Sequence, residues 1–203
     1  MESFFDRVGR VWPAGRRDLH WHILPTPYEA ATLLTPYSGF TRPGLPGVPV
    51  EGMHCTLLHT VGLARTDIDL GPLLEDVGAY ARTVRPFALT FDRPAIGNVA
   101  VEVSGWPQFP FGSIVEHLTA AMTRTGGTFK AAPSRYPHMS VAYTSNGAEN
   151  LEAAGLKSEL AAIDGPLSGT VFADRLHLVE QWHDGRHIMW EPLAVVPLTG
   201  TSV

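Results

Sequence analysis

The sequence is short of three things: cysteine, long apolar runs and positive charge. Cys55 is the single cysteine, so no disulfide can form within the chain, which is typical of proteins from reducing compartments. No uninterrupted apolar run approaches the length of a membrane span, and the first residues, MESFFDRVGRVWP, lack the apolar core of a secretory signal. We therefore expect a cytoplasmic protein that does not bind membranes.

The shortage of positive charge limits the kind of partner. The chain has 15 Lys and Arg against 20 Asp and Glu, a net charge of −5. A long nucleic acid is held mainly by neutralising its phosphates, and this chain offers no overall basic field for that. Any nucleic-acid partner should therefore be small or held at one end, without an extended binding surface. We expect a monomer.

Several sequence motifs are missing as well. There is no Walker A run, no dinucleotide fingerprint after a strand, no His-Glu-x-x-His and no cysteine pair, so we expect neither cofactor nor metal. A metal hydrolase is the alternative, because imidazole binds zinc, but no carboxylate motif matches the histidines. Its ligands would be His20, His22, His54 and His138.

What the chain does contain is an ordered domain with regular elements. Its 203 residues, 44% hydrophobic and 17% charged, suffice for one domain with a substantial core. Periodicity and breakers predict helices from a capping box at Thr26 to near Pro36, over 72–84, over 110–124, and from a cap at Asn146 to 164–166. Strands are expected at 18–25, 53–60, 87–92, 99–104, 137–143, 170–181 and 187–197, with loops at 39–51 and 128–136.

This element order is one unit written twice, each with a histidine strand in its middle. It predicts an α+β fold of two lobes within a single domain, 1–203, the units covering approximately 18–93 and 98–198. Each lobe would be an antiparallel sheet with helices on its outer face. The two histidine strands would then face each other across a central cleft.

The two strands, Met53–Thr60 and Pro137–Tyr143, carry similar residues. With the two-residue period of a strand, one face of the first strand holds His54, Thr56 and Leu58. One face of the second holds His138, Ser140 and Ala142, and both reverse faces are apolar. Two imidazoles and two hydroxyls around one cavity suit a phosphodiester, since histidine exchanges protons near neutral pH and hydroxyls bind phosphoryl oxygens.

A histidine followed two residues later by Ser or Thr is a weak signal alone. Of nine histidines, His117 has it too, but it lies in the predicted helix 110–124 and is set aside as a helix-surface residue. His20 and His22 share one face of the first strand, where they either line the cleft or are structural; the structural interpretation is favoured. Cys55 points away from His54 and belongs in the core.

The paired motifs HCTL and HMSV, on strands of repeated units, resemble those of the two-histidine phosphoesterase superfamily. Within it the chain is most similar to the 2′-5′ RNA ligase-like proteins and RNA 2′,3′-cyclic phosphodiesterases. The resemblance implies that His54 and His138 act as general base and acid, in an order left open, and that Thr56 and Ser140 hold the phosphate. Some members of the superfamily use a basic or aromatic side chain near the second motif, for which Lys130, Arg135 and Tyr136 are the local candidates. His22 is a further candidate substrate contact if it lines the cleft, the alternative to its structural interpretation.

The resemblance implies a metal-independent phosphodiesterase. Its substrate would be a 2′,3′-cyclic phosphate end or a small 2′-5′-linked or cyclic nucleotide. Two alternatives stay open: a module of the same fold that binds nucleotide or phosphate without catalysis, and an RNA 2′-5′ ligase.

Overall fold

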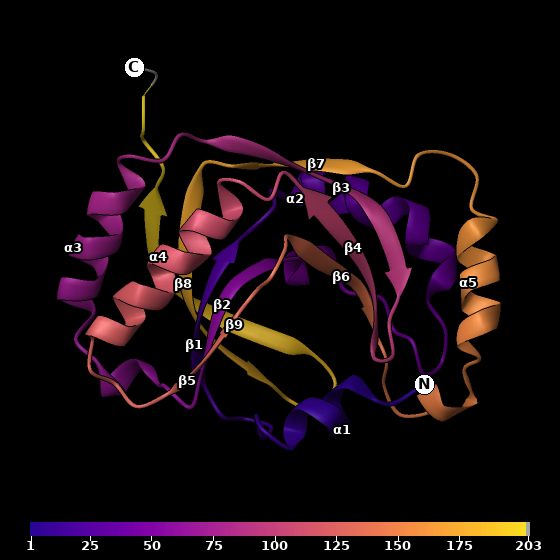
Figure 1. Ribbon diagram of the computed structural model, residues 1–203. Helices are drawn as coiled ribbons and strands as arrows, with labels where there is room; N and C mark the ends of the chain where they lie inside the picture. Colours follow the sequence, from indigo (N-terminus) through magenta and orange to yellow (C-terminus); the bar gives the residue numbers. More distant parts are fainter. Residues whose placement is uncertain (202–203) are drawn as a thin grey trace.

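The computed structural model describes residues 1–201 as two antiparallel sheets that open toward one another, with helices on their outer faces (Figure 1). The strand order is β5-β2-β1-β8-β9 in the first sheet and β6-β4-β3-β7 in the second. The expected α+β fold with two antiparallel sheets is confirmed. The strands are β1 (Asp18–Ile23), β2 (Cys55–Val61), β3 (Phe87–Ile96), β4 (Ala100–Trp106), β5 (Lys130–Pro133), β6 (His138–Tyr143), β7 (Gly169–Ala173), β8 (Arg175–His183) and β9 (Ile188–Pro197).

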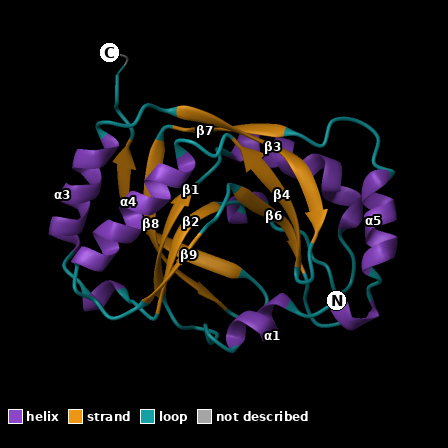
Figure 2. Cartoon of the chain, viewed as in Figure 1, coloured by secondary structure: helices purple, strands orange, loops and turns teal. Residues whose placement is uncertain are grey.

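Helices cover the sheets on the sides away from the space between them (Figure 2). α3 and α4 pack on each other and on the first sheet, and α2 and α5 pack against the second. Each buries one apolar stripe, such as Leu73, Val77 and Ala81 of α3. The helices are α1 (Phe4–Gly9), α2 (Pro27–Leu34), α3 (Leu70–Ala81), α4 (Phe111–Arg124) and α5 (Ala153–Ala161), with short 3₁₀ turns at Thr35–Phe40, Val50–Gly52, Arg65–Asp67 and Ala148–Asn150. Within residues 1–201, no helix combines the length and the apolar character that crossing a membrane requires.

The predicted capping box at the start of α2 is present. The backbone N–H of Thr26 donates to the Glu29 carboxylate at 2.7 Å, and the Thr26 hydroxyl accepts from the Glu29 N–H at 3.3 Å. The other carboxylate oxygen of Glu29 accepts from the N–H of Phe172 on β7 at 2.8 Å. The same side chain therefore begins the helix and attaches it to the second sheet.

The lobes differ from the contiguous units 18–93 and 98–198 expected from the element order. β3 lies in the second sheet although it precedes residue 98, and β8 and β9 lie in the first. The expected strand 170–181 is in fact two strands, β7 and β8, which meet at Asp174 and belong to different sheets. Asp174 and Arg175 are two polar residues in a row, and the buried positions change phase from Val171 and Ala173 to Leu176 and Leu178. This break in the alternation marks the crossing, although neither glycine nor proline does.

Two other local expectations are wrong. The cap expected at Asn146 is followed only by a 3₁₀ turn, and α5 begins after Glu152. The expected loop 128–136 contains β5, which pairs with the edge of β2, placing Lys130 opposite Val61. Both depend on contacts with distant segments, which local sequence patterns do not report.

The first 17 residues, here called the N-terminal strap, connect the two sheets. At one end the N–H of Phe4 donates to the carbonyl of Thr144, just after β6, at 3.0 Å. At the other end the N–H of Gly15 donates to the carbonyl of His183 on β8 at 2.8 Å, and His183 Nε2 donates to the carbonyl of Trp12 at 2.7 Å. α1 thus lies across one end of the space between the sheets (Figure 1).

Candidate active site

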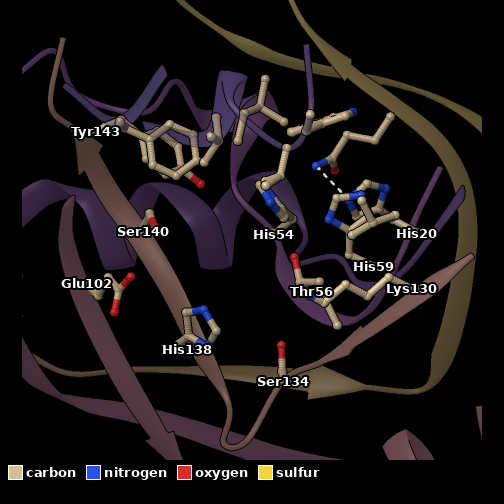
Figure 3. Close-up of a pocket in the computed structure, with 18 residues that line it drawn as sticks. His20, His54, Thr56, His59, Glu102, Lys130, Ser134, His138, Ser140 and Tyr143 are labelled. Carbon is tan, nitrogen blue, oxygen red and sulfur yellow. Dashed lines mark hydrogen bonds between the residues drawn. The ribbon is translucent and has the colours of Figure 1, made fainter. Parts of the chain in front are cut away.

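A cavity of about 420 Å³ lies between the sheets, and both histidine motifs line it. His54 and Thr56 come from the region of β2, and His138 and Ser140 come from β6. Figure 3 shows the two pairs on opposite sides of the cavity. The structure therefore brings the four residues together in one place; their parts in a reaction stay predictions.

The two imidazoles are held in the same way. His54 Nδ1 lies 2.9 Å from the carbonyl oxygen of Gly52, and His138 Nδ1 lies 3.1 Å from that of Tyr136. A carbonyl oxygen only accepts hydrogen bonds, so in both rings Nδ1 carries the hydrogen. This leaves Nε2 of each neutral ring as the nitrogen with a free lone pair. Both motifs therefore fix the tautomer through the carbonyl two residues upstream.

His54 is held in its neutral form by its surroundings. It is only 8% exposed, and burial lowers the pKa of His54 to about 4, with His138 acting in the same direction and the Gly52 carbonyl opposing. The rings of His22 and Trp190 pack against it, with ring centres 4.7 and 5.0 Å away. At neutral pH His54 is therefore an unprotonated, firmly packed base.

The alternation of side chains between the two faces of β2 is interrupted, and as a result a further histidine, His59, faces the cavity. Trp21 of β1 pairs with Leu58 whereas His22 pairs with Thr56, so a β-bulge absorbs Leu57. Leu57 and Leu58 are both fully buried, and the expected placement of Leu58 beside His54 and Thr56 is wrong. His59 lines the cavity instead. The two adjacent leucines, Leu57 and Leu58, interrupt the apolar–polar alternation and were the sequence signal that could have indicated this bulge.

His59 belongs to a second polar group at one end of the cavity. Its Nε2 donates to the carboxylate of Asp18 at 2.9 Å, and its ring stacks on that of His20 with centres 3.9 Å apart. Asp18 is fully buried and also accepts from Arg16 at 2.8 and 3.0 Å. Burial alone would raise the pKa of Asp18, but the hydrogen bonds from His59 and Arg16 hold it below its usual value.

His22 does not line the cavity, which fits the favoured structural interpretation and not the alternative of a substrate contact. It shares the cavity-facing side of β1 with His20, but it is fully buried behind His54 and does not line the cavity. Neither of its ring nitrogens has a hydrogen-bond partner within residues 1–201. Burial, together with His54 and other nearby histidines, lowers the pKa of His22 well below its ordinary value.

Of the three other expected contacts, one lines the cavity. Lys130 does so from β5. Arg135 lines a separate depression formed with α4 and not this cavity, so its contact with a substrate stays a prediction. Tyr136 is 44% exposed and borders the site, with its ring centre 5.3 Å from that of His138.

The remaining walls come from residues that sequence reasoning did not select. Glu102 of β4 and Tyr143 of β6 lie on the side of Ser140, and burial raises the pKa of Tyr143 to about 12. The N-terminal strap supplies an apolar wall. No sequence signal pointed to it, because its amphipathic run is short and its role depends on the cleft that it crosses. Its lining residues are Phe4, Val8, Val11 and Trp12.

Two residues that the sequence set aside are indeed outside the site. His117 lies on α4, where its ring stacks on Tyr80 at 4.0 Å and its Nε2 is 3.5 Å from Asp76. Cys55 is fully buried, and burial raises the pKa of its thiol to about 12, so it is a core residue. As for metals, no three His, Cys, Asp or Glu side chains within residues 1–201 are grouped to hold an ion.

The chain shares its fold with several solved structures. It is similar to LigT from E. coli complexed with NADP+, with a TM-score of 0.66 and 16% identity over 90% of this chain and 98% of that one. TT0787 from Thermus thermophilus gives a TM-score of 0.63 and 17% identity over 91% and 100%. A structure described as a phosphoesterase gives 0.62 and 15% over 91% and 99%. No protein-family profile matches the chain, and no curated protein matches it in sequence.

Proposed function

We propose that this protein is a metal-independent phosphodiesterase acting on 2′,3′-cyclic phosphate ends or small 2′-5′-linked or cyclic nucleotides. The observation that carries the proposal is the paired arrangement of the site. Two imidazoles, each with Nδ1 donating to the carbonyl two residues before it, share one cavity with two hydroxyls. Such a set can supply a base, an acid and phosphate ligands at once.

The order of base and acid follows from the pKa of His54. Because His54 is neutral at neutral pH, its Nε2 takes a proton from water as the water oxygen attacks phosphorus. His138, on the opposite side, gives a proton to the oxygen whose bond to phosphorus breaks. The products are a phosphomonoester and a free hydroxyl group.

Charge that shifts onto the phosphoryl oxygens needs fixed donors. The hydroxyls of Thr56 and Ser140 and the ammonium group of Lys130 line the same cavity and can serve as those donors. Donors already in place require little reorganisation as the reaction proceeds, which is why they lower the barrier. Proton transfer at each end contributes about 10²–10⁴-fold.

Similar structures support a nucleotide as the ligand. E. coli LigT has been solved with NADP+, with 3′-AMP and with ATP, so the shared fold holds nucleotides in that protein. For this chain we propose a monomer that binds one small nucleotide or one RNA end, in keeping with its net charge of −5.

The test is turnover by the purified protein in EDTA. The substrates are nucleoside 2′,3′-cyclic phosphates, RNA ending in a cyclic phosphate, and 2′-5′-linked dinucleotides. We expect hydrolysis of at least one substrate by the native chain. Binding without turnover would instead favour a non-catalytic module, and joining of RNA ends would favour a ligase.

A further inference from the structure

The cavity has one polar side and one apolar side, and the apolar side belongs to the N-terminal strap. Phe4, Val8 and Val11 recur at helical spacing along it and face the cavity with Trp12. The Phe4 ring lies 4.4 Å from that of Tyr143, and Ile188 extends the apolar surface from β9. A bound phosphodiester would therefore have an apolar surface beside its phosphate.

The strap is fixed in place at both ends. Besides the bonds to Thr144 and His183, the amino group of Met1 donates to the carbonyl of Ala148 at 3.0 Å. Trp12 is 4% exposed, with its ring centre 5.3 Å from that of His59. The strap therefore presents a preformed wall across one end of the cleft, so a longer ligand could not continue through that end.

The charge and the size of the cavity further restrict the kind of ligand that it can bind. Among the lining residues, Lys130 is the one lysine or arginine, and Glu102 offsets its charge. A monoanionic diester suits this balance better than a polyphosphate, because each added negative charge would lack a partner. The volume of about 420 Å³ is near the lower end of the range for small-molecule sites, ~300–1,000 Å³.

We propose that the N-terminal strap is the specificity-determining wall of the site, and that it selects a single nucleoside cyclic phosphate whose flat base packs on Val8 and Val11. This inference rests on the proposed phosphodiesterase function. It narrows the substrate to a mononucleotide without a polyphosphate and disfavours a cyclic phosphate at the end of an RNA chain.

The experiment compares three substrates with the same reactive group. They are a nucleoside 2′,3′-cyclic phosphate, glycerol 1,2-cyclic phosphate, which lacks a base, and a short RNA ending in the same cyclic phosphate. For the native protein we expect kcat/KM to be at least about 10-fold higher for the nucleoside than for either other substrate, since packing one face of a base on apolar side chains removes enough apolar surface from water for a gain of about that size. Equal values for the nucleoside and for glycerol cyclic phosphate would overturn the proposal, as would a preference for the RNA.

Variants locate the effect on the strap. Val8→Asn should lower kcat/KM for the nucleoside about 10-fold, through KM, and should lower kcat/KM for glycerol cyclic phosphate by much less. Val11→Ser, at a position 63% exposed where packing is not at risk, should act in the same direction. The matched control is Asp6→Asn, exposed on the same helix and not lining the cavity. An equal loss on both substrates would contradict the proposal.

A separate measurement keeps the strap testable if no substrate turns over. Absence of turnover would overturn the proposed function, but nucleoside 2′-monophosphate could still be titrated into the native protein and Val8→Asn by calorimetry. Weaker binding to the variant, with binding to Asp6→Asn unchanged, would support the strap as the base-binding wall. Equal affinities would overturn it.

Discussion

At the scale of single residues, the two motif histidines make the same kind of hydrogen bond, each from Nδ1 to the carbonyl two residues before it, but they differ in burial. His54 is 8% exposed and packed against His22 and Trp190, whereas His138 is half-buried. Their common tautomer and different burial support different parts in one proton transfer. This difference has consequences for the dependence of rate on pH.

The first prediction concerns that dependence. Because His54 must be neutral to act as a base, and its pKa is about 4, kcat/KM should stay high at pH 5 and fall only as the pH approaches 4. The alkaline limb reports loss of the acid's proton, and both apparent pKa values belong to the interacting pair. A rate profile measured from pH 3.5 to 9 checks this. An acid limb at pH 6–7 would mean that the base is not a buried imidazole.

The second prediction concerns His22, a buried imidazole without a hydrogen-bond partner in residues 1–201. Burial keeps His22 neutral in the folded protein, whereas in the unfolded chain it binds a proton below about pH 6.5. The unfolded state then binds more protons, so stability falls as the pH drops below 6.5, by about 1.4 kcal/mol per unit for such a group. His22→Leu should remove this part of the loss and raise the free energy of unfolding at pH 5.

Urea unfolding of the native protein and His22→Leu at pH 7.5 and pH 5 measures the effect. The variant's advantage should be larger at pH 5 than at pH 7.5. The control is His187→Leu, which removes an exposed imidazole of the β8–β9 turn that lies 3.4 Å from the Asp184 carboxylate, and which should therefore show no advantage at pH 5 over pH 7.5. An equal slope in native protein and His22→Leu would show that His22 is not the neutral buried group described here.

At the scale of elements, local patterns were sufficient for most strands and helices but not for how they join. Alternation located the histidine strands, and the helical stripe of Leu73, Val77 and Ala81 located α3, because both depend on neighbours along the chain. The bulge at Leu57, the edge strand β5 and the crossing at Asp174 depend on partners from distant segments. The motif residues were therefore predictable, whereas His59 and the N-terminal strap were not.

The third prediction belongs to α2. Thr26→Ala removes the hydroxyl that accepts from the Glu29 N–H, and such caps stabilise proteins by about 1 kcal/mol. We expect the free energy of unfolding to fall by about that amount without a change in kcat, since α2 lies on the outer face. Thr26→Ser, which keeps the hydroxyl, is the control. A loss of kcat in folded Thr26→Ala would show that α2 contributes to the site.

At the scale of the whole molecule, two sheets with interleaved strands bring the two motifs to one cavity. β3 sits beside β4, and β8 beside β1, so each sheet contains strands from both halves of the sequence. This exchange and the N-terminal strap tie the lobes together. The site therefore depends on the folding of the complete chain, including segments distant from either motif.

The central claim is that His54 and His138, and not the histidine with the same motif on α4, perform the chemistry. The measurement is kcat/KM in EDTA with a nucleoside 2′,3′-cyclic phosphate for the native protein, His54→Ala, His138→Ala and His117→Ala, each confirmed to be folded. We predict losses of about 10²–10⁴-fold for His54→Ala and His138→Ala and almost none for His117→Ala. A folded His117→Ala without activity, beside an active His138→Ala, would contradict the account.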